Sequence, residues 1–488
     1  MPSRASLDPL ATEAARAAAP ALAALAPAEV ATLLRDLAVV LREHTDELVA
    51  VAEEETRLGD VRLRSEVLRT RAQLEMFAEI AEEGAHLDVM IDRADDTVVP
   101  APRPDVRRML VPLGPVAVFT ASNFPFAFSV LGGDTASALA AGCPVVVKAH
   151  EGHPRLTDRT AALAAEVLPP GALSVVHGRE AGRTLVTDPV VQAVGFTGST
   201  PGGRALFDLA ARRPDPIPFY GELGSLNPVV VTPQALAARG PDLVSEYIAS
   251  VTRSQGQLCT KPGLLFLPDR HDLDELLRLA VTQTPPAPML GSWIAEAYRT
   301  TLDELAAHPA VRRIAAAPTD AHRVGRPTEG PSATLLTVTA HDLRAHPELL
   351  RECFGPASTV VTYASTEDLL SSLRKLPGSL TATVHGQEQA DEELSREIWS
   401  ALRAGRLIWN DWPTGVAVTR AMHHGGPWPA TTNPLHTSVG GTAVARWLRP
   451  VAYQNMPEAL LPHPLRTTNP WRVPQRTGAI SPPRPASS

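Results

Sequence analysis

The chain has 488 residues, of which 44% are hydrophobic and 20% are charged, and its formal net charge is −8. Length and composition predict a globular protein of two or three modules, and the acidic balance argues against a nucleic-acid binder, which would carry a basic face. No apolar run reaches the roughly 20 residues that a membrane-spanning helix needs, so we expect no membrane partner.

The N-terminal part of the chain has a helical pattern. Between residues 10 and 85, apolar side chains such as Leu34, Leu37 and Leu41 recur at helical spacing, with charged residues between them. Residues 89–112 are different, because acidic residues and prolines alternate there with valines. This pattern predicts an extended excursion or hairpin outside the core, which could serve as an intersubunit arm.

From residue 113 onward, strand and helix patterns alternate. We expect strands at residues 115–119, 144–148, 173–176 and 190–196, and helices at residues 127–141 and 155–168. Such alternation predicts a parallel sheet with right-handed crossovers, and ligands bind such sheets at the carboxyl ends of the strands. A second α/β region is expected between about 224 and 434, with strands at 226–231, 263–267 and 406–410, followed by a late strand at 447–456.

Cys259 is the candidate nucleophile, and it is one of only three cysteines. Its neighbours in residues 255–260 are mostly small or polar and include a glycine, which lets the backbone approach a ligand. Cys143, by contrast, lies among apolar residues. A reactive thiolate needs access, nearby donors and a base; the alternative for Cys259 is a packed thiol. Three cysteines are too few for a disulfide framework and favour a cytoplasmic protein.

Two strand ends could bind a nucleotide. Residues 196–203 follow a strand and precede a helical pattern, so Gly198 and Ser199 could present backbone amides to a pyrophosphate, or the segment is an ordinary turn. Lys148 follows another strand, and its ammonium could donate to a ribose hydroxyl or a 2′-phosphate. Glu151 could accept from the ribose diol and would repel a 2′-phosphate, unless the two residues form only a solvated charge pair.

Three further positions carry polar side chains that could do chemistry. Glu222 lies between glycines and beside aromatic and apolar residues, which is consistent with a general base of raised pKa or with an exposed loop glutamate. The Asn123 amide could donate to an oxyanion or serve a turn. His423 and His424 are adjacent, but the sequence shows no cluster of His, Cys or carboxylate residues around them, so we expect no bound metal.

Taken together, these segments resemble the aldehyde dehydrogenase superfamily. They occur in the order of that family and at similar separations, with Cys259 lying 37 residues after Glu222, and they span residues 113 to about 450. The matching segments are residues 123–125, Lys148, residues 196–199, 222–228, 256–260 and 352–356.

The resemblance implies an α/β fold with a Rossmann-type cofactor domain, an α/β catalytic domain and a small oligomerisation arm. The cofactor domain would comprise residues 1–88 and 111–223, including the N-terminal helical layer. The catalytic domain would comprise residues 224–434, and the arm and C-terminal tail would comprise residues 89–110 and 435–488.

The resemblance also implies a role for each matching residue. Cys259 would be the nucleophile, Glu222 the general base, and Asn123 the oxyanion donor together with the Cys259 backbone N–H. The cofactor would be NAD or NADP. Lys148 would hold the adenosine ribose, Gly198 and Ser199 the pyrophosphate, and Glu352 the nicotinamide ribose. Glu151 and Phe354 are also predicted to bind the cofactor.

The implied reaction oxidises an aldehyde to a carboxylic acid. Cys259 would form a thiohemiacetal and then a thioester, and Glu222 would activate the water that hydrolyses the thioester. Family members that pass the acyl group to coenzyme A typically lack this glutamate, so its presence favours hydrolysis. Alternatives from other classes are a cofactor-independent thiol esterase that uses Cys259 and Glu222, and a non-enzymatic protein on the same fold.

A narrower resemblance is to the 2,5-dioxovalerate (2-oxoglutarate semialdehyde) dehydrogenases, whose relatives include NADP-linked dehydrogenases of longer aldehydes. It rests on residues 132–144, 424–431, 437–440 and 448–454. Arg253 and Ser254 depart from the family pattern, which has an apolar residue or glycine there, and Ser225 stands in place of a glycine. Arg253 could affect the choice of substrate, or it is a surface arginine.

Two further expectations concern the cofactor and the assembly. Relatives in this branch often use NADP, whereas Glu151 would disfavour a 2′-phosphate, so the sequence predicts NAD or NADP without a preference. An exposed strand edge on the arm would pair with another chain, so we expect a homodimer or homotetramer.

Overall fold

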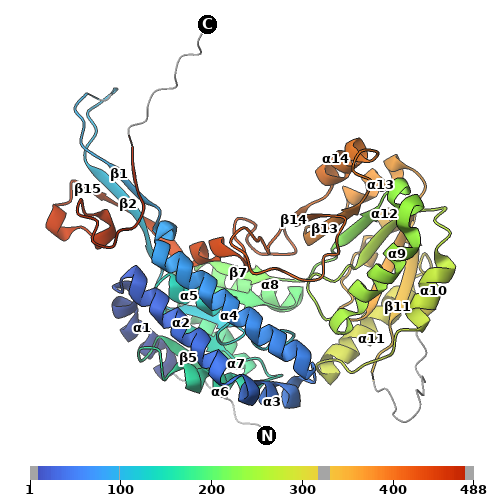
Figure 1. Cartoon of the computed structure of the whole chain (residues 1–488), viewed down its shortest axis with the longest axis horizontal. Helices are drawn as coiled ribbons and strands as arrows, with labels where there is room; N and C mark the ends of the chain where they lie inside the picture. The colour runs from blue at the N-terminus through green and yellow to red at the C-terminus, as the bar shows by residue number, and fades with distance from the viewer. Residues whose placement is uncertain (1–8, 98, 317–329, 479–488) are drawn as a thin grey trace.

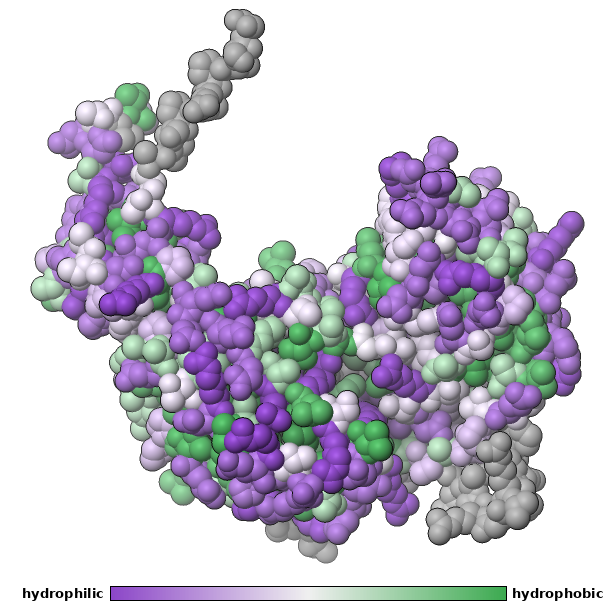
Figure 2. Space-filling model, viewed as in Figure 1, coloured by the Kyte–Doolittle hydropathy of each residue, from purple (hydrophilic) through white to green (hydrophobic). Residues whose placement is uncertain are grey.

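The computed structural model describes residues 9–97, 99–316 and 330–478. In these residues the strands form sheets of five, seven and four strands. Figure 1 shows the five-stranded and seven-stranded sheets in separate bodies, with the four-stranded sheet projecting as an arm from the first body. The face drawn in Figure 2 is mostly hydrophilic, and the arm and the second body rise on either side of a broad hollow.

Four helices cover the first body, as the helical pattern of residues 10–85 predicts. They are α1 (Pro9–Ala23), α2 (Pro27–Glu43), α3 (Thr45–Thr56) and α4 (Asp60–Glu83). Helices α2 and α4 lie side by side (Figure 1). Leu34, Leu37 and Leu41 of α2 are buried in the core of this body, and burial of each leucine contributes roughly 1.5–3 kcal/mol to folding.

The five-stranded sheet is parallel throughout and has the strand order β5-β4-β3-β6-β7. Its strands are β3 (Val116–Phe119), β4 (Val145–Lys148), β5 (Leu173–Val176), β6 (Ala193–Thr197) and β7 (Phe219–Glu222). The connecting helices are α5 (Gly133–Ala140), α6 (Pro154–Ala164), α7 (Arg179–Thr187) and α8 (Thr200–Ala211). The strand order reverses between β3 and β6, and ligands bind at such a point, outside the carboxyl ends of the strands.

The helix expected at residues 127–141 was wrong at its start, because α5 begins only at Gly133. The preceding residues turn tightly: the Phe128 N–H donates to the Phe124 carbonyl, and the Gly133 N–H donates to the Ala127 carbonyl. A side chain at Gly132 would press on the Ala127 backbone. The glycine therefore permits a close chain reversal that apolar periodicity alone does not reveal.

The seven-stranded sheet has the order β10-β11-β12-β9-β8-β13-β14, and only β10 and β11 pair in antiparallel fashion. Its strands are β8 (Pro228–Val231), β9 (Leu264–Pro268), β10 (Arg312–Ala316), β11 (Thr334–Thr339), β12 (Ala357–Tyr363), β13 (Ser379–His385) and β14 (Ala404–Trp409). The helices of this body are α9 (Pro233–Thr252), α10 (Asp274–Thr282), α11 (Ser292–Ala306), α12 (Ala340–Ala345), α13 (Thr366–Leu373) and α14 (Glu392–Ala401).

The arm is a sheet with the order β15-β2-β1-β16. Its strands are β1 (Val89–Asp92), β2 (Val106–Pro112), β15 (Leu448–Gln454) and β16 (Gln475–Thr477), and β1 and β2 form the expected hairpin. Short 3-10 helices lie at Ala85–Leu87, Arg253–Gly256, Pro347–Leu349, Gly441–Trp447, Glu458–Leu460 and His463–Leu465. The strand β16 was not expected in the tail.

Buried polar contacts join the arm to the first body. Arg446, just before β15, forms an ion pair of 2.6 Å with Asp134 of α5. The indole of Trp447 donates to the Ser137 hydroxyl, with an N–O distance of 2.8 Å. The roles and boundaries expected for the three segments stay predictions, and residues 1–8, 98, 317–329 and 479–488 lie outside the described part of the chain.

Candidate active site

A cavity of about 730 Å³ lies where loops of the two bodies meet. Its walls include residues that follow β3, β6 and β7 and loops of the seven-stranded body. Seven of the nine predicted site residues line it: Asn123, Gly198, Ser199, Glu222, Cys259, Glu352 and Phe354. The tertiary structure thus brings together residues that are more than 200 positions apart in the sequence.

The turn that carries Cys259 is fixed by two asparagine side chains. Nδ2 of Asn227 donates to the carbonyl oxygens of Cys259 and Lys261, at 2.7 and 2.9 Å. Nδ2 of Asn123 donates to the carbonyl of Gln257 at 2.9 Å. The predicted oxyanion donor therefore also contacts the loop of the predicted nucleophile, from the first body across to the second.

The backbone just before Cys259 has an uncommon conformation. Ser254 and Gln255 have φ angles of 52° and 55°, and Gly256 follows with 62°, so three residues in succession are left-handed. Residues with a side chain rarely adopt this region. A side chain at Gly256 would overlap the Gly355 carbonyl, so the glycine allows the Cys259 loop to pack on the loop that carries Glu352.

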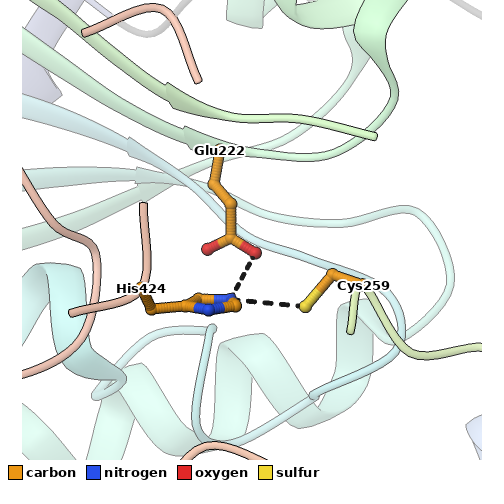
Figure 3. Close-up of side chains that lie close together, drawn as sticks. All are labelled: Glu222, Cys259 and His424. Carbon is orange, nitrogen blue, oxygen red and sulfur yellow. Dashed lines mark hydrogen bonds and ion pairs between the residues drawn. The ribbon is translucent and has the colours of Figure 1, made fainter. Parts of the chain in front are cut away.

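Three side chains, two of which line the cavity, lie close together (Figure 3). Sγ of Cys259 lies 3.4 Å from Nε2 of His424, and the same nitrogen lies 2.8 Å from Oε1 of Glu222. The three ligand atoms all lie within 4.8 Å of one another. The expectation that no Cys or carboxylate surrounds the histidine pair was wrong, because Glu222 and Cys259 are distant from His424 in sequence.

The hydrogen-bond partners of His424 determine its proton position. An ionised carboxylate only accepts hydrogen bonds, so the contact with Glu222 places a proton on Nε2. The other ring nitrogen, Nδ1, is buried and has no hydrogen-bond partner. The backbone N–H of His424 donates to the Thr437 hydroxyl at 2.7 Å, and the side chain is only 1% exposed. The imidazole is therefore held with its Nε2–H facing both the carboxylate and the sulfur.

Glu222 is the last residue of β7 and is buried, not exposed in a loop. Burial would raise its pKa, but the charge of His424 and hydrogen bonds from His424, Ser438 and Cys259 together lower the pKa below its ordinary value. The Ser438 hydroxyl donates to Oε2 at 2.6 Å. The expected raised pKa was therefore wrong, because the sequence does not show these donors.

The pKa of the Cys259 thiol is shifted upward, in the opposite direction to that of Glu222. Burial, the negative charge of Glu222, a hydrogen bond to it and the charge of Glu352 raise the pKa of Cys259 well above its ordinary value. A thiol with such a pKa is protonated at neutral pH, and the thiolate is the nucleophile. Before the reaction, the protonated thiol of Cys259 therefore lies beside the ionised carboxylate of Glu222.

The opposite wall of the cavity fits a dinucleotide. Ser199 caps helix α8, accepting from the Gly202 N–H, and the N-terminus of this helix borders the cavity, where it favours a phosphate. A side chain at Gly224 would displace the Glu352 carboxylate and press on the Thr200 hydroxyl. Burial is the main cause that raises the pKa of Glu352 to about 7.

Lys148 and Glu151 lie at the same sheet edge but are not among the residues that line this cavity. Lys148 ends β4, and its Nζ lies 3.1 Å from Oε1 of Glu151. Nε of Arg179, at the start of α7, lies 3.6 Å from Oε2 of the same glutamate. One carboxylate thus lies between two cations, and the structure does not bring this cluster to the nucleophile.

A second cavity of about 240 Å³ also borders Cys259, together with His424 and residues of α4. Cys259 is the predicted site residue common to both cavities. A molecule in the second cavity can therefore reach the sulfur while the first cavity holds another molecule.

A sequence model described as "Aldehyde dehydrogenase family" matches residues 8–428. The chain belongs to the aldehyde dehydrogenase family. It is therefore an aldehyde-oxidising enzyme that uses a nicotinamide cofactor, as the sequence predicts.

Two relatives of this aldehyde dehydrogenase are similar over most of their length. It is 46% identical to "Alpha-ketoglutaric semialdehyde dehydrogenase 2" of Azospirillum brasilense, over 88% of this chain and 83% of that protein. It is 41% identical to "Alpha-ketoglutaric semialdehyde dehydrogenase" of Acinetobacter baylyi, over 87% of this chain and 82% of that protein.

Solved structures confirm the predicted fold. Aldehyde dehydrogenase 21 from Physcomitrella patens, solved with succinate, superposes with a TM-score of 0.76 at 21% identity, covering 92% of this chain and 90% of that one. Aldehyde dehydrogenase C from Pseudomonas syringae, solved with NAD+ and octanal, gives a TM-score of 0.75 at 20% identity, covering 91% and 87%.

The charge of Glu222 should control the reactivity of Cys259. In Glu222→Gln the negative charge is removed, so the pKa of Cys259 falls and the thiolate forms at lower pH. We expect the pH profile of iodoacetamide alkylation to shift to lower pH, with faster alkylation near neutrality.

Glu367→Gln, at an exposed position of α13, makes the same chemical change far from the site and should leave the profile unchanged. Cys259→Ser gives the background from the two other, buried cysteines. An unshifted profile in Glu222→Gln would contradict the electrostatic coupling.

Proposed function

We propose that this enzyme oxidises 2,5-dioxovalerate, which is alpha-ketoglutaric semialdehyde, to 2-oxoglutarate through covalent intermediates on Cys259. The observation that carries the mechanism is the position of Sγ, which borders both cavities and lies 3.4 Å from His424. The substrate assignment is supported by the names of the two relatives at 46% and 41% identity.

The first step is deprotonation of the thiol. Glu222, with its lowered pKa, takes the proton from Sγ, and its hydrogen bond from His424 weakens as it becomes neutral. The Nε2–H of His424 lies within reach of the sulfur and donates to the thiolate. His424 thus stabilises the nucleophile as a hydrogen-bond donor.

The thiolate then attacks the aldehyde carbon and forms a thiohemiacetal. Asn123 has two amide hydrogens, and one of them is used by the Gln257 carbonyl. The second donates to the developing oxyanion, together with the backbone N–H of Cys259. Removing one such donor typically costs about 10²–10³-fold in rate.

When bound, a nicotinamide cofactor would supply the oxidant, an acceptor for the hydride of the substrate carbon, and Cys259 would then hold the acyl group as a thioester. The residues of this chain that would hold the cofactor are Gly198 and Ser199 at the pyrophosphate, Glu352 with Phe354 at the nicotinamide ribose, and Lys148 with Glu151 at the adenosine ribose. Glu222 first releases the thiol proton to solvent and is again ionised. It then takes a proton from water, and the resulting hydroxide attacks the thioester, which gives the carboxylic acid and releases the Cys259 thiolate.

Kinetic measurements should distinguish the roles of Cys259 and Glu222. Cys259→Ala should abolish aldehyde oxidation without loss of the folded state. Glu222→Gln should lower the steady-state rate by about 10²–10⁴-fold, the usual contribution of a general base. Without the negative charge of Glu222 the pKa of Cys259 falls, so the thiolate can form by losing its proton to solvent. A burst of reduced cofactor stoichiometric with enzyme should therefore precede the slow phase.

Stopped-flow absorbance of the reduced nicotinamide with 2,5-dioxovalerate measures both phases. Retained activity in Cys259→Ala, or a Glu222→Gln enzyme at the normal steady-state rate, would contradict the assignments. Because Cys259 beside His424 is also a pair that serves thiol esterases, ester hydrolysis without cofactor, together with no aldehyde oxidation, would favour that alternative.

Both NAD and NADP are proposed as cofactors, because the charges near Glu151 oppose one another. Glu151 would repel a 2′-phosphate, while Lys148 and Arg179 attract it. Glu151→Gln should raise the ratio of kcat/KM for NADP to that for NAD by about 10-fold, the effect of roughly one pKa unit of interaction energy. Glu166→Gln, exposed beyond the far end of α6, is the matched control, and an unchanged ratio in Glu151→Gln would show that Glu151 points away from the ribose.

The arm is proposed to join chains into a homodimer or homotetramer. Strand β15 is an edge strand of the arm sheet, and its outer edge has no strand partner within the described residues. Light scattering should therefore give two or four times the chain mass of 52.0 kDa. A mass equal to one chain would contradict the role of the arm.

A further inference from the structure

Cationic side chains concentrate in the second cavity, the one of about 240 Å³ that Cys259 and His424 border. Arg62 and Arg69 of α4 line it together with Arg253, and Glu66 is the carboxylate among its lining residues. Three positive charges therefore face one negative charge. Phe124, whose ring lies 5.2 Å from the Arg62 guanidinium carbon, forms part of the apolar wall.

The spacing on α4 explains why these charges share one wall. Residues 62, 66 and 69 are separated by four and three positions, so they lie on one face of the helix. This face is directed toward the cavity, although a charged helix face usually contacts solvent. Glu66 is buried, and both arginines are only partly exposed.

Both helix arginines keep hydrogen-bond donors without a partner. Arg62 donates from Nη2 to the Asn123 carbonyl, but its Nη1 is buried and unpaired. Arg69 donates from Nη1 to the Val416 carbonyl, but its Nε is buried and unpaired. An unsatisfied buried donor on a charged group is costly, so each guanidinium lacks an acceptor.

Glu66 does not supply this acceptor. Its Oε1 accepts from the backbone N–H groups of Phe126 and Ala127, at 2.8 and 3.0 Å. Its Oε2 has no hydrogen-bond partner and lies 4.0 Å from Arg62. Glu66 therefore holds the 126–127 loop and leaves the guanidinium donors free.

The charges of the predicted catalytic residues also affect the pKa of an arginine that lines this cavity. Burial lowers the pKa of Arg69, while the charges of Glu66, Cys259 and Glu222 raise it. Burial and the charge of Arg253 both lower the pKa of Arg62. A second anion in the cavity would offset the cost of burying these cations.

We propose that Arg62 and Arg69 bind the carboxylate of the aldehyde substrate in this cavity, and that Arg253 at its exposed rim attracts the anion. A carboxylate has two oxygens that accept from guanidinium donors, so it can bind the two arginines that line the cavity, and the aldehyde end then extends toward Cys259, which lines the same cavity. This inference rests on the proposed function and identifies the substrate class as short aldehydes with a distal carboxylate.

The test compares two aldehydes of equal chain length, 5-oxopentanoate and pentanal, which differ in the carboxylate. In the wild type, kcat/KM should be higher for 5-oxopentanoate. In Arg62→Met and in Arg69→Met, the ratio of the two kcat/KM values should fall by about 10- to 100-fold, the loss expected when hydrogen bonds to a charged group are removed.

The matched control is Arg64→Met, on the same helix. Arg64 pairs with Asp46 and Asp60 at the surface and does not line the cavity, so the same loss of charge should leave the ratio within about twofold of the wild type. Glutarate as a competitive inhibitor provides a second measurement, and its inhibition constant should rise in Arg62→Met but not in Arg64→Met.

Arg253→Met is the variant to use if the helix variants do not fold, because Arg253 is exposed. It should reduce the salt dependence of kcat/KM for 5-oxopentanoate while that for pentanal stays independent of salt. An unchanged salt dependence would overturn the role of Arg253.

The outcomes separate this inference from the proposed function. A wild-type enzyme that prefers 2,5-dioxovalerate and 5-oxopentanoate to pentanal, with ratios that Arg62→Met and Arg69→Met leave unchanged, would overturn the arginine site and retain the function. A wild-type enzyme that prefers pentanal would overturn the proposed substrate itself.

Discussion

The anchoring of the Cys259 turn is the constraint on which the rest of the site depends. Asn227 binds two carbonyls of this turn, Asn123 binds a third from the other body, and Gly256 packs directly on Gly355. These contacts join segments that are distant in the sequence, and they fix the Cys259 turn relative to both bodies. Because Cys259 lines both cavities, a shift of this turn would change the position of its side chain in both of them together.

A negatively charged residue lies on one side of the Cys259 sulfur and positively charged residues lie on the other. The two sides also differ in how many hydrogen-bond partners the buried charged groups have. Glu222 has donors from His424 and Ser438 and stays ionised, which keeps the neighbouring thiol protonated until the base takes its proton. On the other side, Arg62 and Arg69 are buried without a full set of acceptors. The site therefore places the ionised Glu222 close to a cavity that is lined by cationic side chains and that His424 also borders.

The sequence predicted most elements because their signals are local. Apolar runs such as residues 144–148 and 173–176 became adjacent parallel strands, and the repeat of leucines after residue 30 became α2. The start of α5 could not be predicted in this way, since it depends on tight turns around Ala127 and Gly132. The pKa of Glu222 could not be predicted either, because its direction depends on donors from residues 424 and 438 that contact it only in the folded chain.

The sequence by itself determined the family and the fold class, and it predicted the site residues, because ordered motifs at fixed separations are properties of the chain. Only the tertiary structure brought His424 to Cys259 and turned one face of α4, which the pattern assigns to a structural layer, toward the nucleophile. The physical reason is that contacts between distant segments depend on how loops cross between the two bodies. Periodicity records which side of a helix is apolar, but it does not record which buried charge will lack a partner.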